Sequence, residues 1–327
     1  MRNEVLELLR LSRAVTPGFG LPSEAFRQAA MESAGHAAAG DAGANADDTH
    51  DIPRSTEAGE RIGGWRVIRE IGRGGMGAVY LVERAGAEFA QRGALKLVEG
   101  SGRAEGVHRR LERERRILAS LSHPHIAQLL DGGRAADGRP YLVMEYVEGR
   151  HIDRFCDEER LTIDERLALF SHVCAALQQA HRQLVVHRDV KPSNIIVTAD
   201  RHPILLDFGI ARLLSADEDH DGAATGPAAR ILTPDYASPE QVRGEPVAIA
   251  SDVYQLGLLL YELLTGVQAQ SINRAAKART LEQAVCDSEP IRPSVRARNR
   301  SPECYAARRT TPRALSRTLH GLSLIHI

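Results

Sequence analysis

The sequence contains few cysteines, no uninterrupted long apolar run and no excess of charge of either sign. Its 327 residues carry a formal net charge of -1, whereas nucleic-acid-binding domains usually show a strong basic excess. The four cysteines are Cys156, Cys174, Cys286 and Cys304. They show no C-x-x-C spacing, which argues against a zinc ribbon or a dithiol redox motif. The cysteine pattern fits a reducing cytoplasm, so we expect a cytoplasmic domain. Because the charge is nearly balanced, we also expect that it does not bind nucleic acid.

Neither a signal peptide nor a membrane span is indicated by the apolar residues. The amino terminus mixes acidic residues into its apolar ones and lacks the continuous apolar core of a signal peptide. The longest apolar stretch, Val253 to Val267, is interrupted by Gln255, Tyr261 and Glu262 and is too short to cross a bilayer. We interpret it as a buried helix, and expect no membrane segment in this chain.

The first 61 residues differ in composition from the rest of the chain. Residues Asn3 to Arg13 have apolar side chains at helical spacing and predict a short amphipathic helix. From Ser33 to Gly59 the chain is rich in Ala, Gly, Asp and Thr, a composition that cannot offset the entropy of ordering the backbone. We therefore expect residues 1–61 to be a short helix and a flexible linker.

The remaining sequence changes from a strand pattern to a helix pattern. Alternating apolar residues from Trp65 predict a small sheet within residues 62–147. Helical periods dominate residues 148–293, with two short apolar strands at Ile195 to Val197 and Ile204 to Leu206. A small β-rich unit thus precedes a larger helical one.

A glycine cluster interrupts the predicted sheet. The segment from Gly72 to Val79 reads G-x-G-x-x-G-x-V, and its other glycines in this pattern are Gly74 and Gly77. Glycine lets a backbone approach phosphate closely. The same spacing occurs in dinucleotide-binding folds, but those require a helix straight after the glycines. Because Ala78 to Val82 continues as a strand, we expect a phosphate-covering hairpin, with an ordinary glycine turn as the alternative.

Lys96 lies in an apolar strand, where an ammonium group is costly to bury unless it meets an anion. The next segment predicts a helix whose apolar stripe consists of Val107, Leu111, Leu118 and Leu121. Glu114 falls on this stripe, and an acid in such a position needs a partner. We therefore expect Glu114 to pair with Lys96.

Two further motifs complete a resemblance to a known family. The segment from His187 to Asn194 reads H-R-D-V-K-P-S-N, and the triplet D-F-G begins at Asp207. Together with the glycine segment, the strand lysine and the helix glutamate, these motifs resemble the protein kinase family in order and spacing. The resemblance is closest to bacterial (Hanks-type) kinases with G-G-M-G in the loop. It implies an α+β fold with a small β-rich N-lobe and a larger, mostly helical C-lobe.

The resemblance implies a role for each matching polar residue. Lys96 would hold the α- and β-phosphates of ATP, and Glu114 would orient Lys96. Asp207 and Asn194 would ligate Mg²⁺, with Mn²⁺ as an alternative, and Asp189 would take the proton of the acceptor. The transferred phosphoryl group is loosely bonded in its transition state, so positioning and charge neutralisation dominate catalysis. Carboxylates are suited to the hard cation.

The acceptor is implied by the residues that follow Asp189. Lys191 resembles the lysine with which serine/threonine kinases contact the moving phosphate. The stretch from Thr233 to Glu240 resembles the end of an activation segment, with Ser-Pro-Glu in place of Ala-Pro-Glu. Asp252 resembles the aspartate that braces the catalytic-loop backbone, and a helix N-cap is a second interpretation. The implied enzyme is a non-specific serine/threonine protein kinase that acts on proteins and on itself.

The nucleotide pocket follows from the same register. The cofactor-binding residues are expected to be Gly72, Gly74, Gly77, Val79, Ala94, Lys96, Glu145, Val147 and Ile196. Among these, Val79, Ala94 and Ile196 would sandwich adenine. Met144 would lie at the back of the pocket, and Glu145 to Val147 would offer backbone hydrogen bonds to adenine. Plain core packing is the alternative for each apolar residue. His187 is expected to be structural and not a base. Between Gly209 and Thr233 the candidates for autophosphorylation are Ser215 and Thr225, and Thr225 is the expected site because it lies among Ala, Gly and Pro.

The carboxyl end departs from the family pattern. After Pro293 relatives continue with helices, whereas residues 294–327 are rich in arginine and show no helical stripe. A solvated basic tail, a nucleic-acid patch and a shifted reading frame are the alternatives, and a nucleic-acid patch lacks the aromatic residues for base stacking. The ending from Ser323 to Ile327 resembles translated sequencing adapter. We therefore expect an incomplete C-lobe over residues 148–293. The expected uncovered side chains are Leu258, Leu259, Leu260, Leu263 and Leu264.

Three alternative functions are compatible with parts of the sequence. A nucleotide-binding pseudokinase or scaffold would normally have lost Lys96, Asp189 or Asp207, and all three are present. A small-molecule phosphotransferase typically lacks an activation segment that ends like this one. An inactive kinase fragment would follow if the C-lobe were incomplete. A membrane anchor elsewhere in a longer parent protein is also open.

Overall fold

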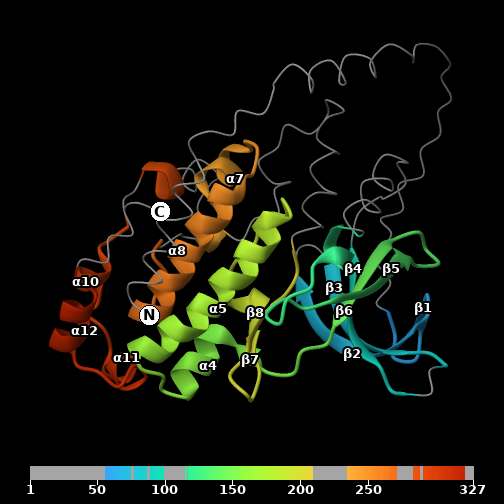
Figure 1. Ribbon diagram of the computed structural model, residues 1–327, viewed down its shortest axis with the longest axis horizontal. Helices are drawn as coiled ribbons and strands as arrows, with labels where there is room; N and C mark the ends of the chain where they lie inside the picture. Colours follow the sequence, from blue (N-terminus) through green and yellow to red (C-terminus); the bar gives the residue numbers. More distant parts are fainter. Residues whose placement is uncertain are drawn as a thin grey trace, which may run out of the picture.

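The chain has two lobes, one made mainly of strands and one mainly of helices (Figure 1). The computed structural model describes residues 56–74, 77–86, 89–98, 115, 117–208, 234–270, 283–287 and 290–320. The predicted α+β class and the two-lobed arrangement are confirmed. The short helix and linker were predicted over residues 1–61, of which residues 1–55 lie outside this description and Arg61 belongs to the first strand. Glu114, Thr225 and Thr233 also lie outside it.

The smaller lobe is an antiparallel sheet with strand order β1-β2-β3-β4-β6-β5. Its strands are β1 (Arg61–Ile62), β2 (Trp65–Gly74), β3 (Gly77–Arg84), β4 (Arg92–Val98), β5 (Leu129–Arg134) and β6 (Pro140–Glu145). Trp65 is fully buried in its core, and the indole N–H donates to the carboxylate of Asp131 at 2.9 Å. The bond satisfies the one polar atom of a large apolar side chain, which fixes β2 relative to β5.

The larger lobe is built around two long helices. Its principal helices are α4 (Ile152–Glu158), α5 (Ile163–Arg182), α7 (Pro239–Arg243) and α8 (Ile249–Thr265). Helix α5 begins with a capping box in which Thr162 and Glu165 satisfy each other's backbone N–H groups. Helix α8 is buried along most of its length and ends at Gly266, whose φ of 73° is in the left-handed region that favours glycine.

A second, three-stranded sheet lies beside the long helices. Its strands, in order, are β7 (Arg150–His151), β8 (Ile195–Val197) and β9 (Pro203–Leu205). The first predicted strand, Ile195 to Val197, is confirmed, and the second begins and ends one residue earlier than predicted. The short helical turn η1 (Pro192–Asn194) directly precedes β8, so this sheet fixes one end of the H-R-D-V-K-P-S-N segment.

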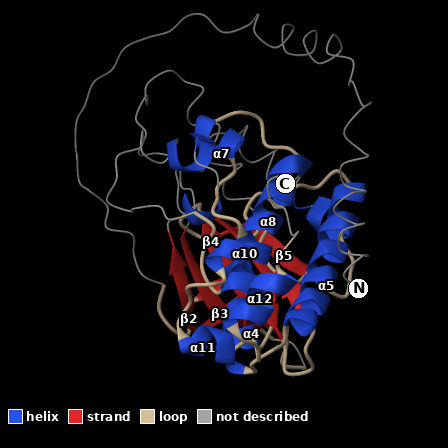
Figure 2. Ribbon diagram, turned by 90° about the vertical axis from the view of Figure 1, so that its left-hand side faces the viewer, coloured by secondary structure: helices blue, strands red, loops and turns tan. Residues whose placement is uncertain are grey.

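The segment after Pro293 is packed against the C-lobe, in contrast to the expected solvated tail. It forms α10 (Pro293–Arg296), α11 (Pro302–Ala306) and α12 (Pro312–Thr318), beside α8 (Figure 1, Figure 2). Leu315 and Leu319 are fully buried, one helical turn apart. The expectation failed because these helices are short and bury few apolar side chains each, so no periodic stripe is visible. The leucines expected to be uncovered, Leu258, Leu259, Leu260, Leu263 and Leu264, are all buried.

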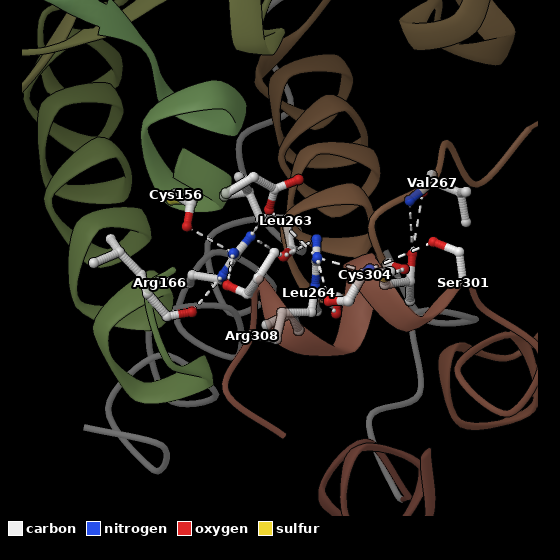
Figure 3. A network of polar contacts seen from close by, with 12 residues as sticks. Cys156, Arg166, Leu263, Leu264, Val267, Ser301, Cys304 and Arg308 are labelled. Carbon is white, nitrogen blue, oxygen red and sulfur yellow. Dashed lines mark hydrogen bonds and ion pairs between the residues drawn. The ribbon is translucent and has the colours of Figure 1, made fainter. Parts of the chain in front are cut away.

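Two buried arginines join this segment to the end of α8 (Figure 3). The Arg308 guanidinium donates to the carbonyl oxygens of Leu264 at 2.9 Å and Leu263 at 3.1 Å. Arg166 of α5 also donates to the Leu263 carbonyl, at 3.0 Å. The carboxylate of Asp157 forms ion pairs with both guanidinium groups, at 2.7 Å and 3.3 Å. The arginines therefore satisfy carbonyl groups that have no partner within the helix, and their positive charge suits the C-terminal end of the helix dipole.

None of the helices in the described ranges is long and apolar enough to span a membrane.

Candidate active site

Asp189, Lys191 and Asn194 form a polar cluster between α5 and β8. The Lys191 ammonium lies 2.8 Å from a carboxylate oxygen of Asp189. The Asn194 side-chain amide donates to the same carboxylate at 3.1 Å and to the Asp189 backbone carbonyl at 2.7 Å. Asp189 is only 6% exposed. The geometry thus brings together three of the predicted site residues around one buried carboxylate.

Asp252 braces the backbone of this loop, as the resemblance implied. Its fully buried carboxylate accepts from the backbone N–H groups of His187 at 2.8 Å and Arg188 at 2.7 Å. The imidazole of His181 donates to it at 2.7 Å. The N-cap interpretation is wrong, because α8 already begins at Ile249. Arg188 has a φ of 70°, a strained value for a residue with a side chain, so the loop needs such support.

His187 is a structural residue in this arrangement. Its Nδ1 accepts from the Asp189 backbone N–H at 3.3 Å, so Nε2 carries the proton and donates to the Leu206 carbonyl at 2.7 Å. Burial lowers the pKa of the imidazole, which favours the neutral form. The ring also packs against Phe208, with ring centroids 4.7 Å apart. The prediction that His187 is not a base agrees with this geometry, since both ring nitrogens are engaged.

Lys96 and Asp207 meet across the two lobes. The Lys96 ammonium, on β4, forms an ion pair with the carboxylate of Asp207, which follows β9. Lys96 is only 7% exposed. A buried ammonium was expected to meet an anion, and the carboxylate of Asp207 is that anion. The apolar stripe around Glu114 predicted that residue as the partner of Lys96, and the Lys96–Glu114 pair remains a prediction because Glu114 lies outside the described residues. Both partners of the observed pair were predicted site residues, but their contact was not predicted.

The glycine segment forms a hairpin, as the strand pattern after it indicated. Strand β2 ends at Gly74 and β3 begins at the opposite residue, Gly77. Gly77 has a φ of 125°, which is open mainly to glycine. A side chain at Gly72 would meet no atom of the described structure within 4 Å, so packing does not account for glycine there. A strand and not a helix follows, which excludes the dinucleotide-binding alternative for this motif.

The apolar side chains that were predicted to contact adenine are partly exposed to solvent. Their strand neighbours Tyr80, Leu95, Val143, Ile195 and Val197 are buried. In contrast, the partly exposed apolar side chains are Val79, Ala94, Met144, Val147 and Ile196. The side chain of Glu145 is exposed, and its backbone N–H donates to the Gln128 carbonyl at 2.8 Å. That N–H is therefore already used within the protein, which narrows the expected adenine contacts to other backbone groups of Glu145 to Val147.

Two glutamines that contact the catalytic loop were not predicted. Gln241 of α7 and Gln255 of α8 both donate to the backbone carbonyl of Arg188. In the sequence, Gln255 stands out only as an interruption of an apolar run. A polar side chain inside a buried helix needs a hydrogen-bond partner. This requirement could have indicated that Gln255 contacts a neighbouring backbone segment.

The comparisons with known proteins agree with this geometry. The family description "Protein kinase domain" matches residues 65–310. The chain belongs to the protein kinase family. The match extends past Pro293 into the segment that forms α10 and α11.

Bacterial proteins are among the relatives of this kinase domain. Serine/threonine-protein kinase PknB of Mycobacterium tuberculosis is 38% identical over 201 residues, which are 60% of this chain and 31% of that protein. Serine/threonine-protein kinase Pkn1 of Myxococcus xanthus is 37% identical over 215 residues, 64% of this chain and 30% of that protein. The chain thus spans less than a third of the length of these relatives.

A solved kinase domain shares the fold. The crystal structure of the Mycobacterium tuberculosis PknI kinase domain has a TM-score of 0.52 and 28% identity. The likeness covers 81% of this chain and 99% of that one.

Proposed function

We propose that the chain is a serine/threonine protein kinase that transfers the γ-phosphoryl group of ATP to protein hydroxyls. The observation that best supports this function is the cluster around the buried carboxylate of Asp189, which contacts the side chains of Lys191 and Asn194. The names of the relatives support a Ser or Thr acceptor. The pseudokinase alternative has no support, because the residues that such proteins usually lose are present and two of them, Lys96 and Asp207, are in contact.

The residues present fit a divalent cation. The Asn194 amide uses its NH₂ group toward Asp189, which leaves its carbonyl oxygen as the ligand atom. Asp207 supplies a carboxylate oxygen, and oxygen ligands are those that Mg²⁺ prefers. Within the described ranges no group of three His, Cys, Asp or Glu residues could hold a metal alone. Mg²⁺ sites in kinases commonly combine one or two side chains with substrate phosphates, so the two-residue donor set is sufficient.

Each charged residue has a task in the proposed reaction. Lys96 binds the α- and β-phosphates, and Asp207 and Asn194 hold the cation, which neutralises charge on the phosphates when bound. Asp189 orients the acceptor hydroxyl and takes its proton. Lys191, beside Asp189, offsets negative charge on the moving phosphoryl group. We propose Mg²⁺ as the working cation, with Mn²⁺ as a substitute.

The partners follow from this chemistry. We propose protein substrates with Ser or Thr acceptors, including the chain itself at Thr225, and a cytoplasmic site of action. We also propose the division into a linker at 1–61, an N-lobe with hinge at 62–147 and a C-lobe that starts at 148. The segment 294–320 packs on that lobe, so we propose to count it as part of the folded unit.

Phosphoryl transfer to a protein tests this function directly. The full chain is incubated with ATP, Mg²⁺ and a generic protein substrate, and phosphosites are mapped by mass spectrometry. We expect phosphate on Ser and Thr of the substrate, with weaker transfer in Mn²⁺ and none in EDTA. A folded protein that transfers no phosphate, or transfers it only to Tyr, contradicts the proposal.

A further inference from the structure

We propose that Gln255 and Gln241 are positioning residues that hold the peptide groups on both sides of Asp189 and link them to the end of the activation segment. This inference rests on the proposed kinase function, since it assigns the glutamines a task through Asp189.

Gln255 engages the loop on both sides of Asp189. Its side-chain carbonyl accepts from the backbone N–H of Val190 at 2.7 Å. Its side-chain NH₂ donates to the backbone carbonyl of Arg188 at 3.2 Å. Gln255 is 1% exposed, so water does not compete for these groups. One amide thus fixes the peptide group before Asp189 and the peptide group after it.

Gln241 adds a second donor from a different helix. Its NH₂ group donates to the Arg188 carbonyl at 2.7 Å, and its carbonyl accepts from Gln255 at 2.9 Å. The same carbonyl accepts from the backbone N–H of Ser238 at 3.1 Å. Ser238 begins the Ser-Pro-Glu triplet at the end of the activation segment. The Arg188 carbonyl is therefore shared between α8 and the residues that end that segment.

The glutamines complete the bracing that Asp252 begins. Asp252 and Gln255 are three residues apart on α8, so their side chains lie on the same face of the helix. Asp252 accepts from the N–H groups of His187 and Arg188, which leaves the Arg188 carbonyl and the Val190 N–H to Gln255. The backbone around Asp189 is thus held by side chains, which suits a loop with the strained Arg188 conformation.

An amide makes both contacts of Gln255 because it carries an acceptor and a donor, whereas an ionised carboxylate carries acceptors alone. A carboxylate of the same shape accepts from the Val190 N–H but repels the Arg188 carbonyl. An aliphatic side chain leaves both backbone groups buried without this partner. The substitution Gln255→Glu therefore removes the donor while it preserves side-chain volume.

The test compares Gln255→Glu with Gln270→Glu in the full chain. Gln270 is also buried and also contacts α8, through the hydroxyl of Tyr254, but it makes no contact with residues 187–190 within the described structure. Because misplacement of a reacting group by about 1 Å can lower a rate by about 10²-fold, we expect Gln255→Glu to lower kcat by roughly 10- to 100-fold. The Kd for ATP with Mg²⁺ should change by less than about twofold, and Gln270→Glu should keep wild-type kcat.

A double-mutant cycle separates positioning from general destabilisation. If Gln255 acts through Asp189, then Gln255→Glu has little further effect on kcat in an Asp189→Asn background, whereas a loss of folded protein lowers both backgrounds equally. Should Gln255→Glu reduce the folded fraction, Gln241→Leu decides, because it removes one donor to Arg188 and leaves the Val190 contact. We expect a several-fold loss of kcat for Gln241→Leu, again absent with Asp189→Asn.

The outcomes distinguish this inference from the proposed function. Folded wild-type protein that transfers no phosphate overturns the kinase function. Asp189→Asn with wild-type kcat overturns the catalytic role of Asp189, on which this inference rests. A different result overturns only the positioning role. In that case the wild type is active and Asp189→Asn is inactive, but Gln255→Glu and Gln241→Leu are folded and keep wild-type kcat. Equal losses of kcat in both Asp189 backgrounds also overturn it.

Discussion

Lys96 of β4 and Asp207, 111 residues later in the chain, form an ion pair that joins the two lobes. The lysine side chain is 8% exposed and the aspartate side chain 23% exposed, so the aspartate is the more accessible partner. The pair places a cation for phosphate and a carboxylate for metal next to each other. Each charge also compensates the other, which a buried ammonium requires.

Asp207→Asn should weaken nucleotide binding and destabilise the protein. The substitution removes the cation ligand and leaves the Lys96 ammonium without its anion, at an expected cost of about 1 to 3 kcal/mol in the free energy of unfolding. Calorimetry of ATP binding with and without Mg²⁺, together with urea unfolding, measures both effects. Asp200→Asn, at an exposed position between β8 and β9, is the control. Mg²⁺-dependent affinity equal to wild type would show that Asp207 does not hold the cation.

Arg308→Met should destabilise the C-lobe without removing an active-site group. Methionine keeps much of the side-chain volume, but the carbonyls of Leu264 and Cys304 lose this buried donor, whereas the Leu263 carbonyl keeps the donor of Arg166. Unsatisfied buried groups cost about 1 to 3 kcal/mol each. We expect a loss of about 3 kcal/mol, or a Tm lower by roughly 6 to 12 °C by scanning calorimetry.

Arg313→Met is the matched control for Arg308→Met, because Arg313 is exposed on α12. Its Tm should stay within about 2 °C of wild type. Equal melting temperatures for the two variants would mean that the contacts of Arg308 with the end of α8 do not contribute to stability.

Glu262 should make stability depend on pH. Burial, followed by repulsion from Asp153 and Asp235, raises the pKa of its carboxyl to about 7, and the hydroxyl of Tyr236 donates to it. The folded state then binds more protons than the unfolded state between about pH 4.5 and 7, so stability falls as pH rises through this window. Glu262→Gln should remove that fall and stabilise the protein at pH 8 by up to about 3 kcal/mol.

Urea unfolding from pH 5 to pH 8 measures the effect of Glu262→Gln. The exposed Glu245 provides the control, since Glu245→Gln should leave the pH profile as in wild type. A Glu262→Gln profile that still falls between pH 5 and 7 would show that other groups control it.

The sequence motifs predicted the residues of the catalytic site better than they predicted the helices at the carboxyl end of the chain. Asp189, Lys191 and Asn194 are close in sequence, so their motif spacing already implied one cluster, and the pattern of apolar residues predicted strands β8 and β9 to within one residue. The Lys96–Asp207 contact depends on how the two lobes meet, which no local pattern reports. Gln255 was visible as a buried polar residue, but its partners come from a loop 65 residues earlier.

The tail illustrates a different limit. Sequence patterns identify helices by apolar periodicity, and α11 and α12 are too short to show it. From its charge alone, Arg308 would be predicted to lie in solvent. In the structure it is 2% exposed, and its guanidinium donates to backbone carbonyls. Such a role becomes visible only when the end of α8 is placed beside it. The resemblance of Ser323 to Ile327 to adapter sequence stays a prediction, since these residues lie beyond the described range.

Substitution of Asp189 tests the central claim most directly. Because a positioned general base contributes roughly 10² to 10⁴-fold to a rate, Asp189→Asn should lower kcat for phosphoryl transfer by about that factor, while the Kd for ATP with Mg²⁺ and the Tm stay near those of wild type. The measurement is the steady-state rate of transfer to a Ser- or Thr-containing protein substrate at saturating ATP, Mg²⁺ and substrate. A kcat for Asp189→Asn within a few-fold of wild type would contradict the assignment of this cluster as the catalytic centre.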